Sequence, residues 1–136
     1  MKILSLIVLF MFFTFKIYGH GTIIVQGVEH EEGKIDVKIY INKDTFLKEE
    51  LAAETIRKKP TKGETIIPLT KIHEGQIAIV AYHDEDGSGE LKTGLFWTPK
   101  EGFAFSNNYT PKGPPNFKKA SIKLTHGEPV IIELNY

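Results

Sequence analysis

The strongest strand signal in the sequence is Gln76-Ile77-Ala78-Ile79-Val80-Ala81-Tyr82-His83. β-Branched and aromatic residues fit extended backbone. A short, nearly continuous apolar run bounded by turn residues predicts a central strand that is buried on both sides. A turn precedes this segment at residues 73–75, and an acidic loop containing glycine follows it. We therefore place this segment at the centre of a β-sheet.

Two further segments near the start of the chain read as strands. Residues 22–28 are rich in β-branched side chains, and residues 35–41 alternate apolar with polar side chains. Alternation of this kind predicts one apolar face and one face toward water. We expect the two segments to form a hairpin through a turn at residues 31–33.

The rest of the chain continues the pattern of short strands. Residues 42–63 predict a loop with one helical turn, and residues 64–69 predict a strand. A closing hairpin is expected from residues 120–125 and 129–134. About seven short strands with almost no helix predict an all-β fold, an antiparallel immunoglobulin-like or transthyretin-like sandwich. A small barrel is the alternative.

The first residues predict export. Met1 and Lys2 precede an apolar run that ends before Lys16, and Gly19 offers a small residue for cleavage. A basic start followed by a short apolar segment is typical of a signal peptide. We expect residues 1–19 to be removed and residues 20–136 to form a single domain that does not span a membrane. An uncleaved anchor is the alternative. Localisation is expected to be the periplasm or the extracellular side of the cell envelope.

Charge and composition narrow the classes of partner. The chain has 17 basic and 17 acidic residues, and cleavage would remove two lysines and no acid, which leaves a net charge of −2. Arg57 is the only arginine. This composition argues against nucleic acid as a partner. Without cysteine, the chain has neither disulfides nor a thiol nucleophile.

The loop after the central strand has the spacing of a metal-binding loop. Oxygen-bearing side chains alternate at Asp84, Asp86 and Ser88, and Glu90 would offer its carbonyl oxygen. The first half of a helix-loop-helix calcium site has this rhythm, with glycine at its sharp bend, here Gly89. The loop therefore predicts a candidate calcium site.

A second interpretation assigns the same residues to turn formation. Asp and Ser side chains readily bind nearby backbone amides in turns. The position that should carry a bidentate carboxylate is Leu95, so only half of the calcium pattern is present. If the loop does bind an ion, Glu101 would fold back as a further carboxylate.

Three blocks carry a family resemblance: residues 83–91, residues 99–108 and residues 113–117. In this order they resemble the bacterial family of exported proteins catalogued as domain of unknown function 2141. The similarity extends over nearly the whole mature chain and implies no assigned activity. The family pattern has aspartate where this chain has Lys92, which removes one candidate metal ligand.

Two other groups of residues suggest functions. His83 adjoins three acids and would serve a hydrolase or lyase as a general base, although no nucleophile accompanies it. Trp97 belongs to a run of aromatic residues that would offer a platform for a sugar ring or peptide. The residues expected to bind ligand with it are His83, Glu101, Ser106, Asn107 and Asn108. The alternative is a loop anchored by its own aromatic residues.

Three functional hypotheses follow. The first is a non-enzymatic module that binds a small polar ligand or another, unknown protein, with a calcium ion as the candidate cofactor. The second is a hydrolase or lyase in which His83 and the neighbouring carboxylates act as acid and base. The third is a structural component of the cell envelope.

Overall fold

The computed structural model describes residues 21–91 and 101–136. The predicted signal segment and Trp97 lie outside these residues. The described strands are β1 Thr22–Val28, β2 Lys34–Tyr40, β3 Glu54–Lys58, β4 Gly63–Pro68, β5 Gly75–Asp84, β6 Phe103–Phe105, β7 Ser121–Leu124 and β8 Pro129–Glu133. Three short helices accompany them: η1 Glu49–Leu51, η3 Ser106–Asn108 and α1 Phe117–Ala120. Within the described residues, no helix is both long and apolar enough to cross a bilayer.

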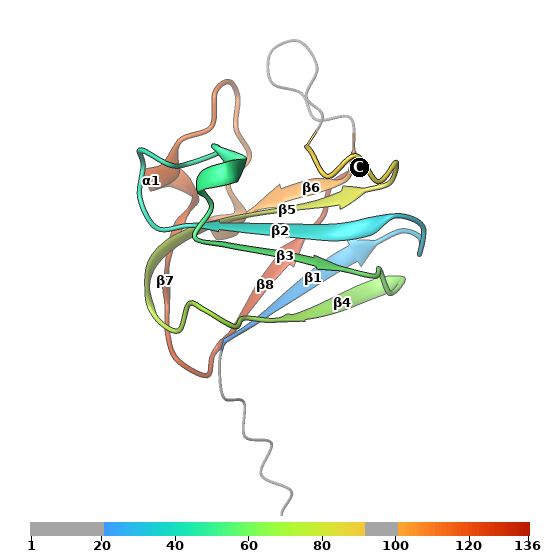
Figure 1. Ribbon diagram of the computed structural model, residues 1–136, viewed down its shortest axis with the longest axis horizontal. Helices are drawn as coiled ribbons and strands as arrows, with labels where there is room; N and C mark the ends of the chain where they lie inside the picture. Colours follow the sequence, from blue (N-terminus) through green and yellow to red (C-terminus); the bar gives the residue numbers. More distant parts are fainter. Residues whose placement is uncertain (1–20, 92–100) are drawn as a thin grey trace, which may run out of the picture.

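The strands form two sheets that pack as a sandwich (Figure 1). One sheet has the order β4-β1-β8, and the other has β3-β2-β5-β6 with β7 also paired to β5. The pairs are antiparallel except that β1 and β8 run parallel. The predicted all-β sandwich is confirmed, with eight described strands rather than seven.

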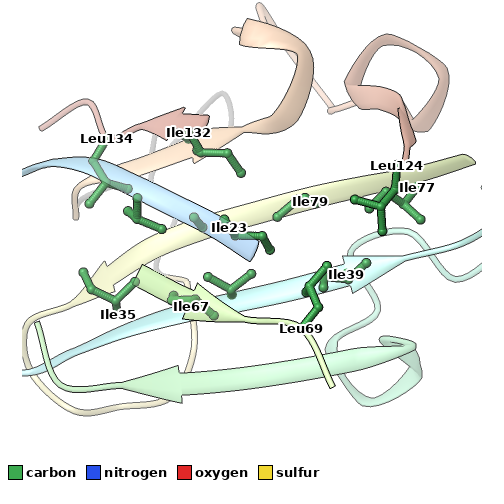
Figure 2. Close-up of a cluster of buried hydrophobic side chains, with 14 of the residues drawn as sticks. Ile23, Ile35, Ile39, Ile67, Leu69, Ile77, Ile79, Leu124, Ile132 and Leu134 are labelled. Carbon is green, nitrogen blue, oxygen red and sulfur yellow. The ribbon is translucent and has the colours of Figure 1, made fainter. Parts of the chain in front are cut away.

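The principal core fills the space between the sheets (Figure 2). Alternate residues of each strand point inward, because successive side chains of a strand face opposite sides. The largest fully buried aliphatic residues are Ile23, Ile35, Ile39, Ile67, Leu69, Ile77, Ile79, Leu124 and Ile132. This core fixes the end of β5, where the acidic loop begins.

Both predicted hairpins are wrong. β1 pairs with β4 and β8, whereas β2 pairs with β3 and β5, so the turn after β1 carries the chain from one sheet to the other. β7 and β8 are likewise divided between the sheets. Each of these turns joins two strands whose apolar sides face each other across the core.

The outer face of the larger sheet is also buried, which corrects the expected water-facing side of β2. Tyr40 and Val80 lie on this face in a second cluster with Phe105 and Ala120. The segments after β2 and after β6 cover them, and Phe46 packs on Tyr40 and Phe105. β5 is therefore buried on both sides, as its sequence predicts. The covered outer face is where the polar residues of the candidate site lie.

β3 was not predicted. Residues 42–63 contain the expected single helical turn, η1, but Glu54–Lys58 then pairs with β2 along its whole length. Its side chains are mostly polar, so no apolar alternation reveals this edge strand.

Candidate functional site

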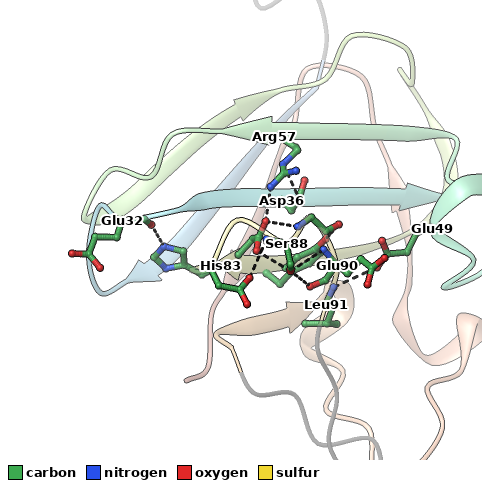
Figure 3. A network of polar contacts seen from close by, with 12 residues as sticks. Glu32, Asp36, Glu49, Arg57, His83, Ser88, Glu90 and Leu91 are labelled. Carbon is green, nitrogen blue, oxygen red and sulfur yellow. Dashed lines mark hydrogen bonds and ion pairs between the residues drawn. The ribbon is translucent and has the colours of Figure 1, made fainter.

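A buried ion cluster marks the outer face at the end of β5 (Figure 3). Asp36 of β2 and Asp84 of β5 are both fully buried. The Arg57 guanidinium from β3 reaches both, with Nη2 2.5 Å from Asp84 Oδ2 and Nε 3.3 Å from Asp36 Oδ2. Burial raises the pKa of the Asp36 carboxyl, and the positive charges of Lys38 and Arg57 oppose that rise. The Arg57 guanidinium thus pairs with two buried carboxylates on the neighbouring strands β2 and β5.

Asp84 also organises the loop that follows it. Its Oδ2 accepts a hydrogen bond from the Gly89 amide at 2.8 Å, and its Oδ1 accepts one from the Ser88 hydroxyl at 3.3 Å. The Ser88 hydroxyl also lies 3.2 Å from the Glu90 carbonyl oxygen, and Asp86 Oδ1 accepts from the Ser88 amide. The loop therefore curls so that the Asp84, Ser88 and Glu90 oxygens converge.

Glu101 adds a carboxylate from the segment that leads into β6, the strand paired with β5. β6 pairs with β5 in a register that sets Phe103 opposite Tyr82, and the His83 amide donates to the Gly102 carbonyl. One more step of this register places Glu101 opposite Asp84. Carboxylate oxygens of Asp84, Asp86 and Glu101 lie within 4.8 Å of one another. The predicted metal-loop residues are therefore brought together, and Glu101 joins them.

The oxygen set fits a hard cation. Ca²⁺ binds carboxylate, hydroxyl and carbonyl oxygens at about 2.3–2.6 Å, so two of its ligands lie up to about 5 Å apart. The Asp84, Asp86 and Glu101 carboxylates supply the negative charge that a divalent cation requires, and Arg57, which also pairs with Asp36, offsets part of it at Asp84. Asp84 offers Oδ1, because Arg57 and the Gly89 amide already bind its Oδ2.

His83 is held away from this cluster. Its side chain is fully buried and points to the opposite side of β5 from Asp84. Nε2 lies 2.6 Å from the Glu32 carbonyl oxygen, and Nδ1 lies 2.7 Å from the Tyr136 hydroxyl. A carbonyl can only accept, so we assign the proton to Nε2 and let Tyr136 donate to Nδ1. Both ring nitrogens are occupied. His30, His83 and Glu85 also gather within metal-binding distance, but the bonds of His83 leave it no free lone pair.

The remaining predicted ligand residues do not form one surface. Ser106 is buried, where its hydroxyl donates to the Ala120 carbonyl and accepts from the Ile79 amide. Asn107 donates its side-chain amide to the Lys119 carbonyl. Asn108 is exposed and lines a shallow pocket beside Tyr109. Among the described residues of this group, Glu101 is the one that adjoins the acidic loop.

The sequence does not indicate the cations and hydroxyls of the site. Arg57 stands out only as the sole arginine, and nothing marks Tyr136. One sequence feature could have indicated the site: polar side chains at alternate positions of β2, namely Asp36, Lys38 and Tyr40. The alternation predicts that these positions face water, whereas the covering loops bury them.

These features define a class: small two-sheet β-sandwich proteins with an oxygen-rich loop at the end of the central strand. The chain belongs to the family described as uncharacterized protein conserved in bacteria (DUF2141), whose model matches residues 23–132. No curated protein and no solved structure matches it.

Proposed function

We propose that this protein is a non-enzymatic binding module of the bacterial periplasm or cell envelope, in which a calcium ion orders the loop at the end of β5. The observation that carries the proposal is the meeting of the Asp84, Asp86 and Glu101 carboxylates within 4.8 Å. These residues come from β5, the loop and the approach to β6. Turn formation alone needs no carboxylate from across the sheet.

The ligands proposed are Asp84 Oδ1, the Asp86 and Glu101 carboxylates, the Ser88 hydroxyl and the Glu90 carbonyl. Calcium accepts this mixture of ligands in a flexible geometry, whereas Mg²⁺ demands a near-ideal octahedron and retains several waters. Arg57 lowers the affinity by holding Asp84. We expect a dissociation constant of about 10⁻⁴–10⁻³ M, the range of extracellular calcium modules.

The calcium proposal is tested by calorimetric titration of the chelator-treated protein with calcium. The parent is expected to bind one ion, and calcium at ten times the dissociation constant to raise the free energy of unfolding by about 1.4 kcal/mol. The double variant Asp86→Asn, Glu101→Gln is expected to lose both effects, because it removes two of the three charged ligands while keeping Asp84, which the fold needs.

A matched control removes the same chemical groups elsewhere. Asp44→Asn with Glu128→Gln replaces two exposed acids in other loops, and we expect it to bind calcium like the parent. If the parent shows no saturable heat, or if the two double variants lose binding equally, the proposal is wrong and the loop serves only as a turn.

The non-enzymatic part of the proposal is supported by His83. A general base needs a free lone pair directed at a substrate proton, and the Nδ1 lone pair of His83 accepts from Tyr136 inside the protein. A hydrolase or lyase would therefore need one of the neighbouring carboxylates, rather than His83, as its base. The ordered loop instead offers an exposed edge, at Glu85 to Ser88, for a small polar ligand or a partner protein.

A further inference from the structure

A second site lies on the outer face of the larger sheet, beside the loop that carries the proposed ion ligands, where the Glu49 carboxylate accepts from the Leu91 amide. It is a cavity of about 140 Å³. Its lining includes Lys38, Tyr40, Leu47, Glu49, Tyr82 and Leu91. A cavity of this size accommodates about six non-hydrogen atoms. The Glu49 side chain is 35% exposed and the Lys38 side chain 7%, so Glu49 lies nearer the mouth and Lys38 nearer the base.

The Tyr40 hydroxyl is the feature that points to a ligand. Tyr40 is fully buried, and its hydroxyl has no hydrogen-bond partner among the residues that the structure describes. Leaving a buried hydroxyl unsatisfied costs about 1–3 kcal/mol. Burial, with the negative charges of Glu49 and Glu50, raises the pKa of Tyr40, so the group remains a protonated donor.

Lys38 and Glu49 supply further hydrogen-bonding capacity. The Lys38 ammonium lies 3.5 Å from Glu49 Oε2, longer than the roughly 2.7–2.9 Å of a direct charged hydrogen bond. It also lies 5.8 Å from the centre of the Tyr82 ring. An ammonium has three donors and a carboxylate several acceptor sites. The pair is neutral as a whole and can still bind a group that both accepts and donates.

We propose that this cavity binds a neutral vicinal diol, as presented by a polyol or by one edge of a sugar ring. One hydroxyl would accept from Tyr40 and Lys38, and its neighbour would donate to Glu49, while the carbon skeleton packs on Tyr82, Leu47 and Leu91. A hydroxyl fits because it both donates and accepts. An anion would meet the Glu49 carboxylate and a cation the Lys38 ammonium, so neither matches the paired charges.

The test is a titration of the full chain followed by protein NMR, with glycerol, methyl α-D-glucopyranoside, sodium acetate and ammonium chloride as separate probes. We expect saturable shifts at Lys38, Tyr40, Glu49 and Leu91 with a diol, and none with acetate or ammonium. Glycerol alone would indicate a free polyol, and the glucoside alone a sugar edge. The titration is repeated in chelator and in calcium, so that this site and the calcium site succeed or fail independently.

The deciding variant is Tyr40→Phe, with Tyr109→Phe as the matched control. Tyr40→Phe removes only the unpartnered hydroxyl, so it should fold with at least the parent's stability and bind the diol about tenfold more weakly, a change of about 1.4 kcal/mol. Tyr109→Phe should bind like the parent. The proposal is overturned if neither diol binds, if acetate or ammonium binds instead, or if Tyr40→Phe binds unchanged. Marked destabilisation by Tyr40→Phe would also overturn it, since the hydroxyl would then already have a partner.

Discussion

The Tyr136 hydroxyl holds the His83 imidazole in place by a hydrogen bond, although the two residues are distant in sequence. This hydroxyl lies 2.7 Å from His83 Nδ1 and accepts from the Glu29 amide at 3.3 Å. Tyr136→Phe leaves the buried Nδ1 without a donor, so we expect a loss of about 1–3 kcal/mol in the free energy of unfolding. Urea denaturation at pH 7 measures this loss.

Tyr109→Phe provides the comparison, because the Tyr109 hydroxyl accepts a single hydrogen bond in an exposed loop, from Asn116. We expect that variant to lie within about 0.5 kcal/mol of the parent. Equal losses in the two variants would mean that His83 does not depend on Tyr136. The sequence located His83 at the end of a buried strand, but it gave no sign of Tyr136, since the two meet only through the tertiary fold.

Among the elements, β3 depends on one buried carboxylate. Glu54, its first residue, accepts from the Thr70 amide and hydroxyl at 2.8 and 2.7 Å and from the Lys71 and Ile72 amides at 3.1 and 3.2 Å. Burial acts to raise the pKa of Glu54, but these hydrogen bonds outweigh it and lower the pKa below the ordinary value of 4.5. The carboxylate ties β3 to the segment between β4 and β5.

The predicted consequence is a pH-dependent loss of stability. Because the folded pKa of Glu54 is depressed, its contribution is present above about pH 4.5 and disappears as the pH falls through the folded pKa. Glu54→Gln should cost about 1.5–3 kcal/mol at pH 7 and progressively less in more acidic solution. Urea unfolding across this pH range measures the difference.

Glu31→Gln is the control for Glu54→Gln, because Glu31 is exposed. A difference between Glu54→Gln and the parent that stays constant from pH 7 to acid would contradict the explanation. Glu54 also shows why β3 could not be predicted from the sequence. The side chains of β3 are mostly polar, which is typical of a loop, and the amides that bind the Glu54 carboxylate are distant in sequence.

On the scale of the whole molecule, the larger sheet lies between two apolar layers, while described apolar residues on the outer face of the smaller sheet are exposed. Ile39 is fully buried between the sheets, and Ile66, on the outer side of β4, is 53% exposed. We expect Ile39→Ala to cost about 2–5 kcal/mol through lost burial and a cavity. Ile66→Ala should change stability by less than about 1 kcal/mol. Chemical denaturation of both variants tests this asymmetry, and similar losses would contradict it.

The sandwich class and the oxygen rhythm of Asp84, Asp86 and Ser88 follow from local patterns, so both could be predicted. The pairing of strands could not, because nearness in sequence suggested hairpins where β1 and β2 lie in opposite sheets. The burial of the outer face of the larger sheet could not be predicted for a similar reason. Lys38 and Tyr40 look water-facing until loops from elsewhere in the chain cover them.

The parallel pairing of β1 with β8 has a consequence for the order in which the molecule assembles. β1 is the middle strand of its sheet, and one of its two neighbours is β8, which follows it in the sequence by about a hundred residues. The larger sheet can begin to form from β2, β3 and β5 while one edge of β1 is still unpaired. That edge stays open to other extended chains until β8 pairs with it. The docking of β8 therefore closes a strand edge at which the folding protein is prone to aggregate.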